Sequence, residues 1–304
     1  MSRIAFLGTP GVAVPTLRAL AQRHDIAIVI TQPDRGRGRG RALSPPPVKV
    51  EAARLGIDLA QPTSAAGIRP ALKSAGGLDL AVVVAYGRIL EPAALEVPAQ
   101  GMLNVHFSLL PRWRGAAPVA RALMEGDPMT GVTIIRLDDG LDTGPVLTAQ
   151  AVDIGSEETA GELSARLAAL GARLLADVIP PYLSGELEPV PQSDEGMTYA
   201  AKIEPGERSI RVDGARGDEV NRVRALSPEP GAVLVIDGDP HQVLRARLHE
   251  TSPEPGRWVA AGGAPVVGLG DGGVEIVELL PPGRRPMSGE AWLRGLRRDT
   301  GNVA

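Results

Sequence analysis

The sequence predicts an α/β fold in two domains: a mostly parallel sheet covered by helices on both faces, followed by a small β-barrel. Three observations lead to this expectation. In the first half, short continuous runs of Val, Ile and Leu alternate with segments of helical periodicity, which is typical of buried parallel strands. Residues 189–206 are rich in Pro and Gly and indicate a linker. After them, short apolar runs are divided by Gly and Pro, as in a small barrel.

The expected elements of the first domain, residues 1–188, follow from this alternation. A helix is predicted at residues 14–23, where Val14, Leu17 and Leu20 repeat at helical spacing, and a longer Ala- and Leu-rich helix at 158–175. Strands are predicted where apolar side chains dominate a short run, at residues 4–7, 26–30, 78–85, 102–106, 130–137 and 145–154.

The second domain is expected at residues 207–304. One amphipathic helix is indicated between Val212 and Leu226. Ser288 is the expected N-cap of a closing helix that ends at residue 297. The predicted strands between these helices are residues 232–236, 242–248, 265–269 and 274–280.

Composition excludes several classes of function. The 304 residues contain no Cys, which excludes a disulfide framework, a thiolate zinc site, an iron–sulfur cluster and a catalytic thiol. The net charge of −4 and the aromatic content of 3% argue against a globally basic nucleic-acid binder and against a base-stacking platform. No apolar run approaches the ~20 residues that span a bilayer, and no signal peptide is visible, so we expect a cytoplasmic protein with no membrane partner.

The turn at residues 8–11 follows the first expected strand and precedes a helix, a position where main-chain N–H groups can bind phosphate. It lacks both the G-x-G-x-x-G pattern of dinucleotide sites and the P-loop signature. We therefore interpret it as a tight strand-to-helix turn.

A stronger candidate site lies at the end of the run at residues 102–106. Asn104 and His106 are two residues apart on the expected strand, so their side chains leave the same face. The carboxyl end of a central strand is where open α/β sheets bind ligands. A lone histidine at a strand end is more often structural, but Trp113, flanked by two arginines in the adjoining loop, favours a functional site.

The loop at residues 138–144 contains Asp138, Asp139 and Asp142 among glycines. Paired acids in such a loop suggest calcium, but the spacing of a calcium-binding loop is missing. A role for Asp142 in orienting a histidine and a simple acidic turn both fit the sequence. The spacing alone does not decide between them.

Asn104, His106, residues 108–118 and Asp142 together resemble the site of the folate-dependent formyltransferases. The 108–118 loop is highly specific to that family, and the likeness runs the whole length of the chain. It includes residues 6–10, 31–35, 47–49, 84–87, 199–203, 230–232, 281–283 and 287–288. The resemblance implies an N-terminal Rossmann-like domain with a mostly parallel sheet and a C-terminal barrel of OB type.

The Arg/Gly segment at residues 35–41 and the C-terminal domain resemble those family members that formylate an aminoacyl-tRNA. The implied reaction, which serves translation initiation, transfers a formyl group from the cosubstrate 10-formyltetrahydrofolate to the α-amino group of initiator methionyl-tRNA. In that reaction Asn104 and protonated His106 stabilise the oxyanion, and Asp142 orients His106. The resemblance implies neither a covalent intermediate nor a metal.

The resemblance also assigns the binding residues. It places the pterin against the backbone of residues 84–90 and the loop before Asp142. The part of the tetrahydrofolate site that it carries over to this chain is Ser108, Leu109, Leu110 and Pro111.

Four arginines in the Arg/Gly segment are expected to contact the phosphates of the tRNA acceptor end: Arg35, Arg37, Arg39 and Arg41. Arg39 is the one that matches a basic position of the family. At positions 36–37 and 41–42 this chain departs from the usual family residues, so its positive charge is redistributed along the segment.

The second domain, the expected tRNA-binding domain, departs from the family at residues 226–229, where Leu-Ser-Pro-Glu replaces the common Phe-Asn-Pro-Trp, and at Val212, where an aromatic residue is common. We therefore expect contact with RNA through phosphates and shape more than through stacked bases. The expected oligomeric state is a monomer.

Two other groups of functions fit parts of the sequence, one of related enzymes and one of binding modules. A formyltransferase for a sugar nucleotide or glycinamide ribonucleotide, or a formyltetrahydrofolate hydrolase, shares the catalytic fold. The glycinamide enzymes generally lack such a second domain, and the sugar enzymes lack the Arg/Gly segment. A non-catalytic RNA- or nucleotide-binding module belongs to a different class, and the co-occurrence of Asn104, His106 and Asp142 argues against it.

Overall fold

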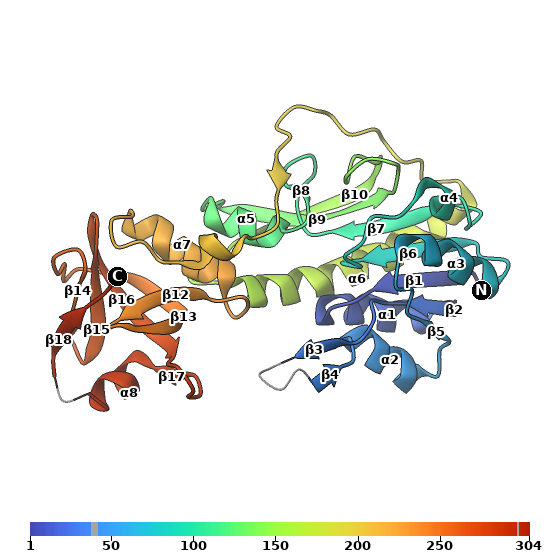
Figure 1. Ribbon diagram of the computed structural model, residues 1–304. Coiled ribbons are helices and arrows are strands. Elements are labelled where there is room, and N and C mark those ends of the chain that lie inside the picture. The colour runs from blue at the N-terminus through green and yellow to red at the C-terminus, as the bar shows by residue number, and fades with distance from the viewer. Residues whose placement is uncertain (38–41, 297) are drawn as a thin grey trace. The chain divides into compact units, whose positions relative to one another are not determined.

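The structure, a computed structural model, describes residues 1–37, 42–296 and 298–304. The chain forms two compact units (Figure 1). Unit 1 comprises Met1–Ala116, Thr130–Val152 and Ser164–Ala200, and unit 2 comprises Ala117–Met129, Asp153–Leu163 and Ala201–Ala304. Among the described residues, no helix is both long enough and apolar enough to cross a bilayer.

Unit 1 is built on a seven-stranded sheet with the order β10-β9-β7-β6-β1-β2-β5. The pairs among β5, β2, β1, β6 and β7 are parallel, and β9 runs antiparallel to β7. This confirms the predicted, mostly parallel sheet. The strands are β1 (Arg3–Gly8), β2 (Asp25–Ile30), β5 (Leu59–Ala60), β6 (Leu80–Val84), β7 (Met102–His106), β9 (Met129–Arg136) and β10 (Val146–Asp153).

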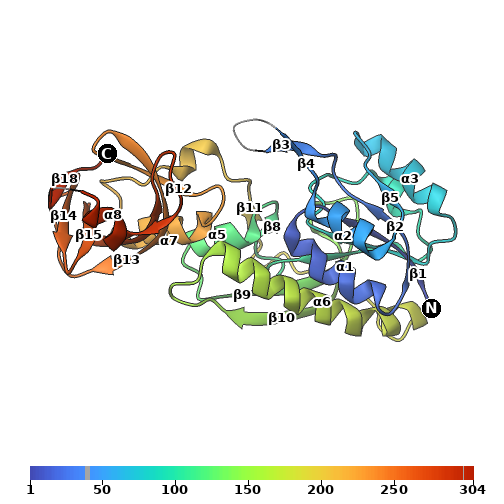
Figure 2. The same ribbon diagram turned by 90° about the horizontal axis from the view of Figure 1, so that it is seen from below.

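Helices cover both faces of this sheet. Figure 2 shows α1 (Val14–Ala21) and α6 (Ala160–Ser184) side by side. Gly171 of α6 lies so close to the sheet that a Cβ there would be 2.5 Å from Cγ1 of Val105, so this face approaches β7 directly. On the opposite face, α3 (Ile68–Ala75) and α4 (Pro92–Leu95) share a core cluster with alternate residues of β1 and β2. Asn104 and His106 point to the face opposite Val105 because β-strand side chains alternate.

Several short elements of unit 1 escaped prediction. The helix α2 (Pro47–Leu55) begins within a run of prolines, which resembles a loop in sequence although proline is well tolerated in the first helical turn. The 3₁₀ turns η1 (Gly11–Ala13) and η2 (Ala65–Gly67) precede α1 and α3. At residues 8–11, Thr9 Oγ1 donates to the carbonyl of Tyr86 over 2.9 Å, which ties the turn to the strand region after β6.

The Arg/Gly segment emerges from a two-stranded antiparallel hairpin made of β3 (Arg35–Arg37) and β4 (Ala42–Ser44). Arg35 pairs with Ser44, so the hairpin begins immediately after Asp34. Arg35 is exposed. Arg39 and Arg41, two of the four predicted tRNA contacts, lie outside the described residues.

Unit 2 contains an antiparallel sheet with the order β12-β13-β16-β15-β14-β18, and β17 pairs with β16. Beyond β18, Ala304 and Val235 exchange main-chain hydrogen bonds of 2.9 and 3.1 Å, which join the last strand to β12 and close the sheet. The predicted small barrel is thus confirmed. Its strands are β12 (Ala232–Ile236), β13 (Asp239–His249), β14 (Arg257–Ala261), β15 (Ala264–Leu269), β16 (Gly272–Leu280), β17 (Met287–Ser288) and β18 (Thr300–Asn302).

The helices of unit 2 are η3 (Pro205–Arg208), α5 (Pro118–Met124), α7 (Arg216–Leu226) and α8 (Gly289–Arg294). Ser288 caps α8 as predicted, because its Oγ accepts from the main-chain nitrogen of Ala291 at 3.2 Å. Inside the barrel, Trp258 is fully buried and meets Trp292 edge to face, with ring centroids 5.4 Å apart. Two of the three tryptophans therefore build the barrel core rather than an exposed stacking surface.

Candidate active site

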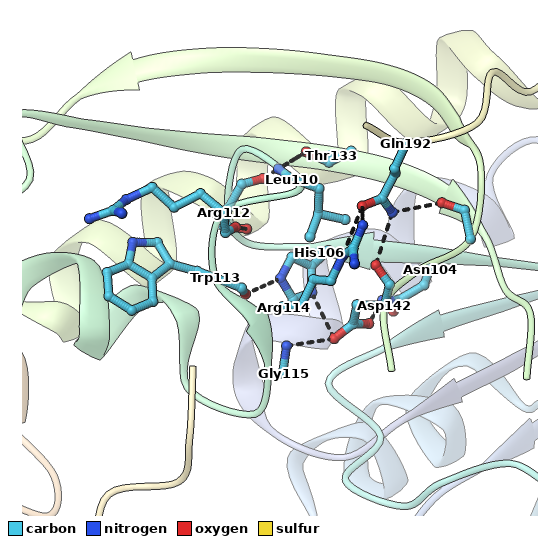
Figure 3. A network of polar contacts seen from close by, with 12 residues as sticks. Asn104, His106, Leu110, Arg112, Trp113, Arg114, Gly115, Thr133, Asp142 and Gln192 are labelled. Atoms are coloured by element: carbon cyan, nitrogen blue, oxygen red, sulfur yellow. Dashed lines mark hydrogen bonds and ion pairs between the residues drawn. The ribbon is translucent and has the colours of Figure 1, made fainter. Parts of the chain in front are cut away.

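Asn104 and His106 lie at the carboxyl end of β7, and both side chains reach one carboxylate (Figure 3). That carboxylate belongs to Asp142, in the loop between β9 and β10. The Asn104 amide nitrogen donates to Asp142 Oδ1 over 3.3 Å, and His106 Nδ1 lies 3.6 Å from Oδ2. The structure therefore brings together the three side chains that the sequence predicted as catalytic.

The His106 ring is held at both nitrogens and is 5% exposed. Its Nε2 lies 2.9 Å from the carbonyl oxygen of Trp113, and since a carbonyl only accepts, Nε2 carries the proton in this contact. Nδ1 faces the Asp142 carboxylate. The ring is thus placed between two acceptor groups, a main-chain carbonyl and a carboxylate.

Asp142 and Asp138 have different tasks in the same loop. Asp138 accepts hydrogen bonds from Gly140 N and Thr143 Oγ1, at 3.1 and 2.7 Å, and thereby builds the turn. Asp142 instead turns toward β7, and its Oδ2 also accepts from the main-chain nitrogen of Gly115 at 2.9 Å. Asp138 thus forms the acidic turn that the sequence left open, whereas Asp142 lies beside His106, which is the placement that an orienting role requires.

The calcium interpretation of this loop finds no support. Within residues 1–37, 42–296 and 298–304, no three Asp, Glu or His side chains gather in a way that would hold a metal ion. The prediction that the reaction needs no metal is untouched by this observation and stays a prediction.

The segment after β7 folds back on itself. Ser108 is fully buried; its Oγ donates to the Arg112 carbonyl over 2.7 Å, and its own carbonyl accepts from Thr133 Oγ1 over 2.7 Å. The same Thr133 oxygen accepts from the main-chain nitrogen of Leu110 at 3.2 Å. Leu109, Leu110 and Pro111, which the sequence assigned to the folate site with Ser108, are partly exposed. A ligand group that accepts a hydrogen bond from the Ser108 hydroxyl must therefore compete with the Arg112 carbonyl.

Trp113 stands at the turn of this segment with a φ of +65°, in the left-handed region that non-glycine residues seldom adopt. Its ring is largely buried, and the Arg112 guanidinium lies 4.4 Å from the ring centroid. This conformation directs the Trp113 carbonyl at His106.

Two residues of the site, Gln192 and Arg114, were given no role of their own from the sequence. The side-chain amide of Gln192 donates from Nε2 to the carbonyls of Asp142 and Gly144, at 2.9 and 2.7 Å. Its Oε1 accepts from Nε and Nη2 of Arg114, at 3.1 and 2.8 Å. Arg114 is 4% exposed. The position of Arg114 beside Trp113 could have marked it as a site residue. Gln192 lies 50 residues from Asp142, inside the predicted linker, and nothing in the sequence pointed to it.

A second polar cluster lies at the root of the β3–β4 hairpin. Lys49 Nζ contacts both Asp34 carboxylate oxygens at 2.8 Å and Gln61 Oε1 at 2.9 Å. The Gln61 amide, which donates to Asp34, and the Lys49 ammonium hold the pKa of Asp34 below its ordinary value. Because Asp34 precedes β3 and Lys49 follows β4, this ion pair joins the two ends of the Arg/Gly segment.

Two family models match the chain. The formyl transferase family matches residues 2–179, and the formyl transferase C-terminal domain matches residues 202–297. Methionyl-tRNA formyltransferase of Halorhodospira halophila is 46% identical and that of Roseobacter denitrificans is 44% identical. The first alignment covers 97% of both chains, and the second covers 99% of this chain and 98% of the relative.

Solved structures share the fold at lower identity. An N-formyltransferase from Helicobacter canadensis, solved with folinic acid and dTDP-3-aminofucose, matches 91% of this chain and 99% of its own with a TM-score of 0.70 and 18% identity. A glycinamide ribonucleotide transformylase from Symbiobacterium toebii matches 62% of this chain and 94% of its own with a TM-score of 0.53 and 23% identity. The second match spans only part of this chain.

Proposed function

Since this chain belongs to the formyl transferase family, and within it to the methionyl-tRNA formyltransferases, we propose that Asn104, His106 and Asp142 catalyse transfer of a formyl group from 10-formyltetrahydrofolate to the α-amino group of initiator methionyl-tRNA. The observation that carries the proposal is the convergence of Asn104 and His106, from one face of β7, on the single carboxylate of Asp142.

The reaction joins the unprotonated methionyl nitrogen to the formyl carbon and moves an electron pair onto the formyl oxygen. The Asn104 amide has two hydrogens, of which one is donated to Asp142. We assign the second to the formyl oxygen, where negative charge develops. Asp142 thus holds the amide plane in the orientation that this contact needs.

His106 supplies positive charge beside the same oxygen. In the free protein the Nε2–H of His106 donates a hydrogen bond to the Trp113 carbonyl. We propose that it donates instead to the reacting atoms when both substrates are bound. When the tetrahedral carbon collapses, the bond to the folate nitrogen breaks, and that nitrogen takes a proton from His106 or from water beside it. The attacking nitrogen gives up one proton to the same His106 or water and thereby restores it, so the net change is one proton moved from the amine to the folate nitrogen.

Asp142 keeps the imidazolium in place throughout. Its Oδ2 faces Nδ1 of His106 and is fixed from the other side by Gly115 N. Because two other donors hold this carboxylate in place, it can keep the His106 ring from turning away. No side chain attacks the formyl carbon in this account, and Ser108, whose hydroxyl is committed to Arg112, is not a nucleophile.

The substrates are assigned to two neighbouring regions of unit 1. We propose that the folate lies against residues 108–111 and the backbone of residues 84–90, where Ile89 is 82% exposed. The acceptor end of the tRNA is assigned to four arginines of the Arg/Gly segment. Two of them, Arg35 and Arg37, lie on the hairpin strand β3, and the other two are Arg39 and Arg41. The cytoplasmic location and the monomeric state expected from the sequence stay predictions.

The test is formylation of initiator methionyl-tRNA by purified protein with 10-formyltetrahydrofolate as donor. Replacing Asn104 with Ala removes one oxyanion donor, so we expect an intact fold with kcat reduced about 10²–10³-fold. Near-normal turnover by Asn104→Ala would contradict the assignment of this residue. Parallel assays with sugar-nucleotide and glycinamide ribonucleotide amines test the acceptor, and preference for either of them over methionyl-tRNA would contradict it.

A further inference from the structure

We propose that Gln192 is a positioning residue for formyl transfer, which sets the distance between the Asp142 carboxylate and His106 by tying the Asp142 loop to Arg114 (Figure 3). This inference rests on the proposed function above. It assigns a catalytic consequence to a segment that the sequence identified only as a linker.

Every polar atom of the Gln192 side chain is used. Both amide hydrogens go to carbonyls of the loop, those of Asp142 and Gly144, and the amide oxygen receives two hydrogen bonds from the Arg114 guanidinium. A primary amide is the one neutral side-chain group that offers two donors and an acceptor in this arrangement. A carboxylate in its place would keep the contact to Arg114 and lose both contacts to the loop.

The two pieces of chain that Gln192 joins are the same two that meet at the catalytic carboxylate. Arg114 and Gly115 form the short strand β8 (Arg114–Gly115), and Gly115 N donates to Asp142 Oδ2. Gln192 binds the side chain of Arg114 on one side and the main chain of Asp142 on the other. It therefore fixes the spacing across which the Gly115–Asp142 hydrogen bond forms.

The rest of the segment at residues 192–200 reinforces this position. Its strand β11 (Tyr199–Ala200) pairs in parallel with β8. Thr198 Oγ1 accepts from Trp113 N at 2.9 Å, and the Thr198 carbonyl accepts from Arg114 N at 2.9 Å. The segment thus contacts Trp113 and Asp142, which face the two ring nitrogens of His106.

Backbone conformation shows why these contacts matter. Trp113 has a φ of +65° and Asp142 a φ of +54°, both in the left-handed region that costs free energy for side chains with a Cβ. Such conformations persist only where the surroundings hold them. Gln192 supplies that constraint at Asp142, and Thr198 supplies it at Trp113.

The deciding variant is Gln192→Glu, tested in the full-length protein. It preserves an acceptor for Arg114 but places carboxylate oxygens against the Asp142 and Gly144 carbonyls. Because misplacement of a catalytic group by about 1 Å can cost 10²-fold in rate, we expect kcat to fall about ten- to a hundredfold. The melting temperature and the KM for 10-formyltetrahydrofolate should stay near those of the wild type. Gln150→Glu, at an exposed glutamine on β10, is the matched control and should leave kcat unchanged.

A double-mutant cycle with Asp142→Asn separates positioning from a general structural role. If Gln192 acts through the Asp142 carboxylate, Gln192→Glu should cost little further activity once Asp142 is Asn, because interacting residues are non-additive. A full, multiplicative loss in that background would overturn the proposal. So would an unchanged kcat in Gln192→Glu, or a loss of activity that only accompanies unfolding of both Gln192→Glu and Gln192→Leu.

The result is also distinguishable from failure of the proposed function. An inactive His106→Ala protein together with a fully active Gln192→Glu protein would remove the positioning role and leave the catalytic assignment in place. A fully active His106→Ala protein would remove the catalytic assignment itself.

Discussion

The main-chain nitrogen of Gly115 donates a 2.9 Å hydrogen bond to Oδ2 of Asp142, the oxygen that faces Nδ1 of His106. The other oxygen of the same carboxylate accepts from Asn104. Asn104 and His106 of β7 and Gly115 of β8 thus meet at one carboxylate. The proposed catalysis depends on this convergence, because the carboxylate relates the amide of Asn104 to the ring of His106.

Gly115→Ala should lower kcat strongly. Gly115 has a φ of +121°, and an added Cβ would lie 2.9 Å from the carbonyl oxygen of Ala200, so β8 must shift from β11 to accept it. The shift moves the donor that fixes Asp142, and we expect a loss of at least about tenfold in kcat, with a lower melting temperature. Gly206→Ala is the control, since a Cβ there meets nothing within 4 Å. Equal kcat values for Gly115→Ala and the control would contradict this role of the parallel pairing between β8 and β11.

Lys49→Met should weaken tRNA use without affecting folate use. The variant removes the ion pair that joins Asp34, before β3, to the start of α2, after β4. We expect the KM for methionyl-tRNA to rise while the KM for 10-formyltetrahydrofolate stays constant, because only the tRNA is assigned to the hairpin. Lys73→Met, at an exposed lysine of α3, should change neither constant. A rise of both KM values in Lys49→Met would contradict this prediction. It would show that the Lys49–Asp34 ion pair stabilises more of unit 1 than the hairpin.

Arg39→Ala tests the Arg/Gly segment itself. The expected effect is a higher KM for methionyl-tRNA together with a shallower dependence of that KM on salt, because loss of one phosphate contact leaves fewer counterions to be released on binding. The KM for 10-formyltetrahydrofolate should not change. KM values for tRNA equal to those of the wild type at every salt concentration would refute the assignment.

Acid stability should depend on Glu51. This side chain on α2 is 5% exposed, and the guanidinium groups of Arg18 and Arg54 lower its pKa from an ordinary 4.5 to about 2. A depressed pKa in the folded state stabilises the protein above the unfolded value, and this contribution is lost as the pH falls from about 4.5 through about 2. The melting temperature of Glu51→Gln should therefore lie below that of the wild type at pH 7, and the two should converge toward pH 2.

Glu186→Gln, at an exposed carboxylate, serves as the control for that experiment and should track the wild type at all pH values. A constant difference in melting temperature between Glu51→Gln and the wild type from pH 7 to pH 2 would mean that the Glu51 ion pairs do not govern acid stability.

Much of the fold was accessible from sequence because burial leaves a periodic signal. The strand at residues 102–106 and the strand at 232–236 were predicted with their observed bounds. Elements without an apolar run were missed. The strand β18 consists of Thr300, Gly301 and Asn302, and it is defined by pairing with β14 rather than by its own side chains.

The same distinction separates the predicted and unpredicted parts of the site. Asn104 and His106 are two residues apart, so strand geometry alone places them together. The place of Asp142 followed from resemblance to a family, since its spacing left two interpretations open, an orienting role and an acidic turn. Gln192 depends on contacts made across 48 to 78 residues of chain, and only the folded backbone reveals them.

The most direct test of the catalytic account is formylation of initiator methionyl-tRNA from 10-formyltetrahydrofolate by His106→Ala beside the wild type, with kcat measured at saturating concentrations of both substrates. Removal of the imidazole takes away the charge at the oxyanion and the proton for the departing folate nitrogen, so we expect kcat to fall at least about 10²-fold while the melting temperature stays close to that of the wild type. A His106→Ala protein that formylates methionyl-tRNA at the wild-type rate would contradict the account.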